Sequence, residues 1–323
     1  MSEALSFNSI TFGYDGEHVV NNVSFSIAQG EVVCLLGPSG CGKTTCLRLA
    51  AGMEQPQKGT ISLNGEVVSS ADMLAPPETR HIGFLFQEFA LFPHLSVYDN
   101  ICFGLTHLSA AEQKARVLEL LKQVGLSGYA NKYPNSLSGG EQQRAALARA
   151  LAPSPKLVLM DEPFSNLDPQ LRDRMRDLTL HLLKQVGAAG LVVTHDAADA
   201  LRMADRIAVQ VDGEILQIDN PETVYRQPAS IEVAGMFGAV NLVKSGEGVR
   251  GFRPADVSFT GTADDFTFNG EIVEVRLMGA DWLCLIKSED GAGFEALLGG
   301  ETPPALGVHK FFVPQARLML FKD

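Results

Sequence analysis

The sequence predicts an α/β domain over residues 1–236 and a small all-β domain over residues 241–323. The first observation behind this division is a set of short aliphatic runs, typical of strands buried on both faces of a sheet, at 32–36, 157–160, 191–194 and 207–211. The second is a set of amphipathic stretches that favour helices between these strands, such as 112–124 and 141–151. After residue 241 the pattern changes to short alternating segments separated by Gly, Asp and Pro, and we expect strands of a barrel or sandwich at 270–277, 282–287 and 317–321.

The composition agrees with two domains and argues against several classes of protein. At 323 residues the chain exceeds the usual domain length of about 100–200 residues, and 46% hydrophobic residues suffice for a core in each part. Acidic residues outnumber basic ones by 38 to 26, so the net charge of −12 argues against a nucleic-acid partner. The five cysteines form no C-x-x-C pair, which favours a reduced cytosolic protein without disulfides or structural zinc. We find no signal-peptide pattern and no apolar stretch of about 18 residues, so we expect membrane association to depend on partner proteins.

A glycine-rich loop follows the first buried strand. Residues 37–44, GPSGCGKT, satisfy the pattern G-x-x-x-x-G-K-[ST] between the strand at 32–36 and a helix expected to begin near Thr45. Lys43 is expected to reach the β and γ phosphates of a nucleotide, and Thr44 to place its hydroxyl on Mg²⁺. The helix N-terminus is also expected to favour the thiolate of Cys41. The predicted nucleotide contacts in this segment are Gly37, Pro38, Ser39, Gly40, Cys41, Gly42, Lys43, Thr44 and Thr45.

A second motif places two acids after a buried strand. In LVLMDEP, at 157–163, four apolar residues lead to Asp161 and Glu162. We expect Asp161 to face Mg²⁺ through water and Glu162 to accept a proton from the attacking water. Together with the phosphate loop, the motif predicts nucleotide hydrolysis but leaves its purpose open.

A third motif, LSGGEQQR at 137–144, begins a strong helical pattern. Ser138 and Glu141 have the spacing of a capping box, which explains these two residues as a folding device. Capping does not explain Gly139 and Gly140, because glycine lowers helix propensity. Paired glycines at a helix start favour the approach of an anion to the backbone.

These motifs, in this order, resemble the ABC ATPase family over residues 1–236. The resemblance implies a P-loop fold with a mixed sheet and a helical subdomain at about 88–155. It implies that Tyr14 stacks on adenine, that Gln87 lies in the Q-loop and contacts Mg²⁺, that Asp168 lies in the D-loop, and that His195 is the switch histidine that contacts the γ phosphate. The implied catalytic residues are Lys43, Gln87, Glu162 and His195. The implied Mg²⁺ contacts are Thr44, Gln87 and, through water, Asp161.

The resemblance also implies how the site is completed. In this family the signature motif, here LSGGEQQR at 137–144, of one subunit closes on the phosphate loop of another, so we expect an ATP-dependent homodimer. Each copy is then expected to contact the ATP of its partner through Ser138, Gly139, Gly140 and Glu141.

Further features are similar to importer ATPases. The chain has one nucleotide-binding domain and no fused membrane span, the segment QEFALFPHL at 87–95 resembles the importer Q-loop region, and the tail is similar to a transport-associated OB-like domain with an R-P stretch at Arg253. The resemblance implies two permease subunits or domains, an indirect periplasmic or extracellular solute-binding protein, and a peripheral position on the cytoplasmic face of the inner membrane. The sequence around Gln87 is most similar to that of ferric-iron importer ATPases. Importers of polyamines, thiamine, sulfate and sugars remain alternatives.

Two other functions compete with import. A soluble ABC ATPase of translation would carry two such domains in tandem, and one of DNA repair would carry long coiled coils; the sequence has neither. The C-terminal domain could in addition bind a regulatory ligand that restrains the ATPase.

Overall fold

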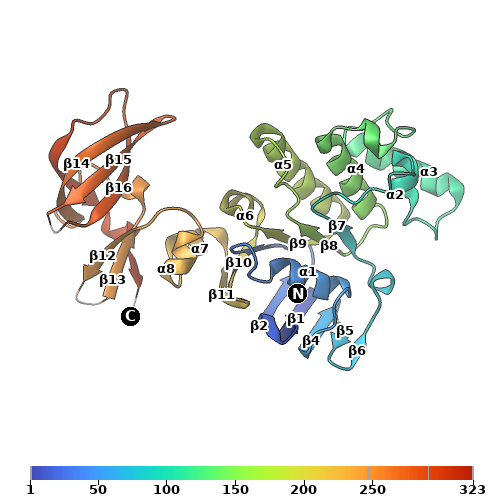
Figure 1. Cartoon of the computed structure of the whole chain (residues 1–323). Helices are drawn as coiled ribbons and strands as arrows, with labels where there is room; N and C mark the ends of the chain where they lie inside the picture. Colours follow the sequence, from blue (N-terminus) through green and yellow to red (C-terminus); the bar gives the residue numbers. More distant parts are fainter. Residues whose placement is uncertain (1, 246–247, 290, 322–323) are drawn as a thin grey trace. The chain divides into compact units, whose positions relative to one another are not determined.

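The computed structural model describes residues 2–245, 248–289 and 291–321 (Figure 1). The chain divides into two compact units, Met1–Pro221 and Glu222–Asp323. This division lies before the expected boundary at 236–241. The physical reason is that Ala234, in helix α8 (Ile231–Gly235), packs in a cluster with Met319 and Phe321 of the second unit.

The first unit contains a six-stranded mixed sheet in the order β11-β10-β3-β9-β8-β7. All neighbouring pairs are parallel except β10 and β11, which are antiparallel. The strands are β3 (Val32–Leu36), β7 (Gly83–Leu85), β8 (Leu157–Asp161), β9 (Ala189–Thr194), β10 (Arg206–Val211) and β11 (Glu214–Asp219). Every residue of β3 and β9 is buried, as expected for central parallel strands. Because these strands are parallel, their carboxyl ends lie on the same side of the sheet. The segments that follow β3, β8 and β9 therefore begin next to one another.

A second sheet in this unit is antiparallel, in the order β2-β1-β4-β5-β6. Its strands are β1 (Glu3–Tyr14), β2 (Glu17–Ala28), β4 (Lys58–Leu63), β5 (Glu66–Ser70) and β6 (Met73–Leu74). Apolar side chains of β1, β2 and β4 share one core with those of the mixed sheet and of helix α1 (Lys43–Ala51). This sheet therefore supports the phosphate-loop helix from one side.

Helices α2 (Val97–Cys102), α3 (Ala110–Gln123) and α4 (Gly139–Leu151) group together between β7 and β8 in the chain (Figure 1). They fall within the range 88–155 expected to form a helical subdomain. Helix α5 (Pro169–Val186) follows β8, and helix α6 (Ala197–Met203) follows β9. No helix in the described part of the chain is long and apolar enough to cross a membrane.

The second unit is built from short helices and β-strands, as expected for an OB-like domain. It holds a three-stranded sheet, β12-β13-β18, and a four-stranded sheet, β16-β15-β14-β17. The elements are α7 (Pro221–Arg226), α8, β12 (Asn241–Ser245), β13 (Gly248–Phe252), β14 (Phe266–Met278), β15 (Asp281–Ser288), β16 (Gly293–Gly299), β17 (Gly307–Val313) and β18 (Met319–Phe321). The last strand is shorter than the expected 317–321, because residues Gln315–Arg317 form a 3₁₀ turn after Pro314.

Candidate active site

The loop between β3 and α1 lies so close to neighbouring backbone that it requires glycine. A Cβ atom on Gly37 would lie 2.0 Å from the carbonyl oxygen of Gln210. Gly42 has a φ of 101°, and a Cβ there would lie 2.3 Å from the carbonyl oxygen of Val19. These glycines let the chain turn from the strand directly into α1, which begins at Lys43, slightly before the expected start near Thr45.

A cavity of about 290 Å³ lies beside this loop. Its lining residues are Val19, Ser39, Gly40, Gly42, Lys43, Thr44, Thr45 and Glu162. The N-terminus of α1 and the ammonium of Lys43 make the cavity suited to a phosphate. Val19 was not expected there, because an aliphatic residue of a strand carries no sequence signal for a binding site.

The ammonium of Lys43 is held by its own loop. Lys43 is buried, and its Nζ donates hydrogen bonds to the carbonyl oxygens of Gly37 at 2.8 Å and Pro38 at 2.7 Å. Cys41 is also buried, and burial raises the pKa of its thiol even though Lys43 acts in the opposite direction. The expectation of a thiolate at Cys41 is therefore wrong, because desolvation outweighs the nearby positive charge.

The end of β8 brings Asp161 to the first turn of α1. The hydroxyl of Thr44 donates a hydrogen bond to Asp161 Oδ1 at 3.0 Å. Burial raises the pKa of the Asp161 carboxyl, while the bond from Thr44 lowers it. A hydroxyl and a carboxylate side by side fit Mg²⁺, which prefers oxygen ligands and combines few protein groups with substrate phosphates. Thr44 and Asp161 are thus a pair of residues that would help to hold the ion.

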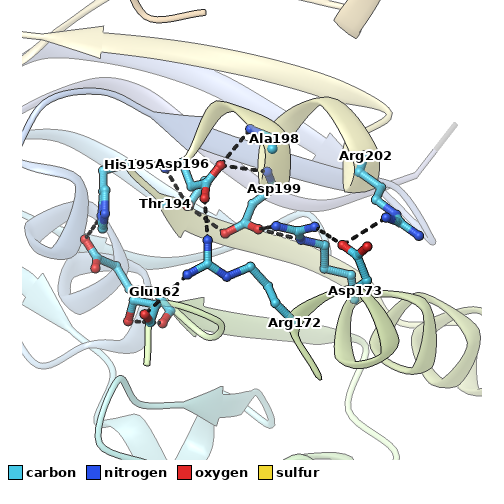
Figure 2. Close-up of polar contacts among 11 residues, drawn as sticks. Glu162, Arg172, Asp173, Thr194, His195, Asp196, Ala198, Asp199 and Arg202 are labelled. Carbon is cyan, nitrogen blue, oxygen red and sulfur yellow. Dashed lines mark hydrogen bonds and ion pairs between the residues drawn. The ribbon is translucent and has the colours of Figure 1, made fainter. Parts of the chain in front are cut away.

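Glu162 and His195 form a contact between two strand ends. The Oε1 atom of Glu162 lies 3.0 Å from His195 Nδ1 (Figure 2). Glu162 has a φ of 43°, in the left-handed region, and its N–H donates to the carbonyl oxygen of Val193 at 2.9 Å. This strained backbone directs the chain away from β8 immediately after Asp161. The structure therefore joins Glu162 of the second motif, the phosphate loop and the histidine after β9 in one place.

Helix α4 begins with the capping box that the spacing predicts. The N–H of Ser138 donates to Glu141 Oε2 at 2.7 Å, and the N–H of Glu141 donates to Ser138 Oγ at 3.4 Å. The bond from the Ser138 backbone is the main reason that the pKa of Glu141 is lowered to about 2. A Cβ on Gly139 would meet no atom within 4 Å, whereas one on Gly140 would lie 2.5 Å from Leu171 Cδ2. Packing against α5 therefore explains why residue 140 is glycine, whereas no contact in the described part of the chain explains the glycine at 139.

Comparison with known proteins identifies the family. A family model described as ABC transporter matches residues 20–165. The Fe(3+) ions import ATP-binding protein FbpC 2 of Haemophilus influenzae is 39% identical to this chain, over 85% of the chain and 85% of that protein. The chain belongs to the ABC transporter family.

Two further comparisons place this ABC ATPase among its relatives. The putrescine transport ATP-binding protein PotG of Escherichia coli is 45% identical over 79% of this chain and 67% of its own length. A dimeric structure of the ATP-binding cassette MJ0796, bound to ADP and Pi, is 32% identical and covers 67% of this chain and 98% of its own, with a TM-score of 0.60. As a member of the family, the chain is an ATPase that uses Mg²⁺. Bound Mg²⁺ neutralises charge on the β and γ phosphates.

Gln87 and Tyr14 are among the predicted site residues that do not line the cavity. Gln87 is exposed in the turn after β7. Phe89 and Ala90, two and three residues further along the chain, have φ values of 61° and 45°, and Arg149 of α4 donates to both of their carbonyl oxygens, at 3.0 and 2.7 Å. Tyr14, at the end of β1, is 40% exposed, and its hydroxyl donates to Glu54 Oε1 at 3.1 Å.

Asp168, which is predicted to lie in the D-loop, forms the N-cap of α5. Its Oδ1 accepts a hydrogen bond from the N–H of Leu171 at 3.0 Å. Pro169 follows at the first helical position, where it has no N–H to leave unsatisfied. Asp168 itself is exposed, so the cap also leaves the D-loop accessible at the surface.

Proposed function

We propose that this ABC ATPase powers solute import through a partner permease, and that two copies clamp two ATP molecules between them. The proposal rests on one observation: within one chain, the phosphate cavity and the start of α4 are separate. Lys43, Thr44 and Glu162 line the phosphate cavity, while the start of α4 at Ser138 is not among the lining residues in the described chain. The capped helix start is therefore available to the ATP of a second copy.

Each motif residue has one task in this proposal. Lys43 and the loop backbone bind the phosphates, and Mg²⁺ would be held by Thr44 and Gln87 and, through water, by Asp161. Glu162 accepts a proton from the attacking water, and His195, held at 3.0 Å from Glu162, contacts the γ phosphate. The remaining contacts are Tyr14 to adenine, Gly37, Pro38, Ser39, Gly40, Cys41, Gly42 and Thr45 to phosphates, Ser138, Gly139, Gly140 and Glu141 to the partner's ATP, and Asp168 at the dimer contact.

The permease contact is proposed beside Gln87. A cavity of about 340 Å³ there is lined largely by apolar side chains, among them Phe84, Phe86, Phe92 and Phe103. Phe103 is 60% exposed and extends this group of apolar side chains, and contiguous exposed apolar patches mark interaction sites. This contact would hold the ATPase on the cytoplasmic face of the membrane. Residues 241–323 are proposed to brace the dimer as a separate OB-like domain.

Ferric iron is the proposed cargo, on the resemblance of the Q-loop region and the name of the relative from Haemophilus influenzae. The name of the Escherichia coli relative makes a polyamine the second candidate. The test reconstitutes the ATPase in vesicles with its own permease and binding protein. Stimulation of ATP hydrolysis by ferric iron and not by putrescine supports the first candidate, and the reverse result supports the second.

The Glu162→Gln variant tests the proposed mechanism. The change keeps the side-chain shape but removes the basicity, so hydrolysis is expected to fall by about 10²-fold or more. Loss of one negative charge beside the triphosphate also favours the closed pair. We expect MgATP, and not ADP, to shift this variant to a dimer in sedimentation velocity.

Lys43→Ala is the matched control, because it removes a phosphate contact and leaves the base in place. It is expected to lose ATP affinity and to stay monomeric with MgATP. Near-parent hydrolysis by Glu162→Gln, or a monomer that binds ATP at saturation, would contradict the proposed mechanism.

A further inference from the structure

Polar contacts form a closed ring behind the Glu162–His195 pair (Figure 2). The ring runs from Glu162 to His195, through the adjacent Asp196 to Arg172, and from Arg172 to Ser165. Ser165 closes it, since its hydroxyl donates to the carbonyl oxygen of Glu162 at 3.0 Å. Residues 162–172 and the loop at 195–196, which are distant in the sequence, thus meet around one guanidinium.

Arg172 contributes two bonds to this ring. Its Nη1 donates to Asp196 Oδ2 at 2.6 Å, and its Nη2 donates to the carbonyl oxygen of Ser165 at the longer distance of 3.4 Å. The first is a short, charge-assisted bond to the residue next to His195. The second bond ends at Ser165, where the predicted D-loop begins. The planar, forked guanidinium suits this bridging role better than an ammonium.

Asp196 divides its two oxygens between two tasks. Oδ1 caps α6 by accepting from the N–H groups of Ala198, at 2.8 Å, and Asp199, at 3.4 Å. Oδ2 is the partner of Arg172. The loop that carries His195 is therefore fixed to its own helix by one oxygen and to α5 by the other.

The other ion pairs between α5 and α6 differ from this one. Arg176 and Asp199 form a pair in which both side chains are buried, and that pair holds the two helices together. Arg202 bridges from α6 to Asp173 at 3.0 Å and to Asp177 at 3.3 Å, at the surface. The contacts of Arg172 instead end at the D-loop and at the histidine loop. Its Nε is buried without an acceptor in the described residues, an arrangement that stability alone does not favour.

We propose that Arg172 is a positioning residue that sets the His195–Glu162 geometry for hydrolysis and links it to the position of the D-loop. The inference rests on the proposed function, in which Glu162 and His195 act on the attacking water and the γ phosphate. Arg172 is not among the residues that line the phosphate cavity. Its loss therefore affects the chemical step and leaves nucleotide binding unchanged.

The test compares Arg172→Gln with Arg202→Gln, which removes a cation from the same pair of helices but breaks only surface pairs. For Arg172→Gln we expect kcat to fall by roughly ten- to a hundredfold, the scale of a misplaced catalytic group, with an unchanged Kd for ATP. Arg172→Lys should recover part of the loss, since an ammonium can pair with Asp196 but cannot fork to Ser165. Arg202→Gln should retain the parent kcat.

A double-mutant cycle decides whether Arg172 acts through His195. If it does, Arg172→Gln has little further effect in a His195→Ala background, because the group it positions is gone. Asp196→Asn, which can still cap α6, provides a second variant if Arg172→Gln does not fold, and should lower kcat in the same way. A parent-like kcat in Arg172→Gln, or losses that multiply with His195→Ala, would overturn the inference. If Glu162→Gln still traps an ATP-bound dimer in that case, the proposed function stands and only the role of Arg172 falls.

Discussion

Helices α3 and α4 begin with the same capping device, and only one of them carries the signature of the family. In α3 the N–H of Ser109 donates to Glu112 Oε2 at 2.9 Å, and the N–H of Glu112 donates to Ser109 Oγ at 3.5 Å. The corresponding distances in α4 are 2.7 and 3.4 Å. Between cap and glutamate, α3 has two alanines and α4 has two glycines. The capping box is therefore a folding device shared by both helices, and the glycines distinguish the helix start that we propose to bind the partner's ATP.

Gly139→Ala gives the first position of α4 the residue found in α3, and we expect this change to have the largest effect. A Cβ there meets nothing in the same chain, so stability should be kept or should rise by up to about 1 kcal/mol. Hydrolysis should fall by about 10²-fold, the usual loss when one backbone donor to a developing charge is blocked. Steady-state ATPase assays and thermal unfolding measure the two effects. A fully active Gly139→Ala variant would show that the partner's ATP does not approach this backbone.

The reverse change, Ala110→Gly, gives the first position of α3 the residue found in α4. Ala110 is exposed at the first position of α3, so glycine there should cost about 0.5–1 kcal/mol of stability through helix propensity. ATPase activity should equal that of the parent, since α3 contributes nothing to the cavity lining. A loss of activity without unfolding would indicate that α3 also takes part in the nucleotide cycle.

We expect the two capping glutamates to make a small, pH-dependent contribution to the stability of the fold. Hydrogen bonds from Ser109 lower the pKa of Glu112, and those from Ser138 lower the pKa of Glu141 from 4.5 to about 2. A carboxyl with a depressed folded pKa contributes stability that is present above its unfolded pKa of 4.5 and is lost as the pH falls towards 2. Thermal unfolding of Glu141→Gln between pH 5 and pH 3 should therefore decline less steeply than that of the parent. An identical slope in both proteins would show that the box does not hold the ionised form.

The short-range features of this protein were predictable from the sequence. The phosphate loop and the capping box of α4 depend on residues within a few positions of one another, and the strands expected at 32–36 and 157–160 follow from continuous apolar runs. The fold class, the family and the importer class of the ATPase are confirmed by the comparisons. The individual roles of the site residues stay predictions.

Long-range features could not be predicted. The antiparallel sheet of the first unit depends on pairing between β1 and β4, which are far apart in the chain. The raised pKa of Cys41 follows from burial by the folded chain, and a local dipole argument misses it. The sequence around Arg172 does not indicate that its partner is Asp196, because only the packing of α5 against α6 brings Arg172 and Asp196 together.

The preformed cap at Ser138 has a consequence for the thermodynamics of association. The helix start is already ordered in the single chain, so two copies that close on ATP need not freeze this segment when they meet. The heat-capacity change of ATP-driven dimerisation should therefore reflect the apolar area buried at the contact, without an added contribution from coupled folding. In calorimetric terms, this half of the clamp behaves as a rigid surface.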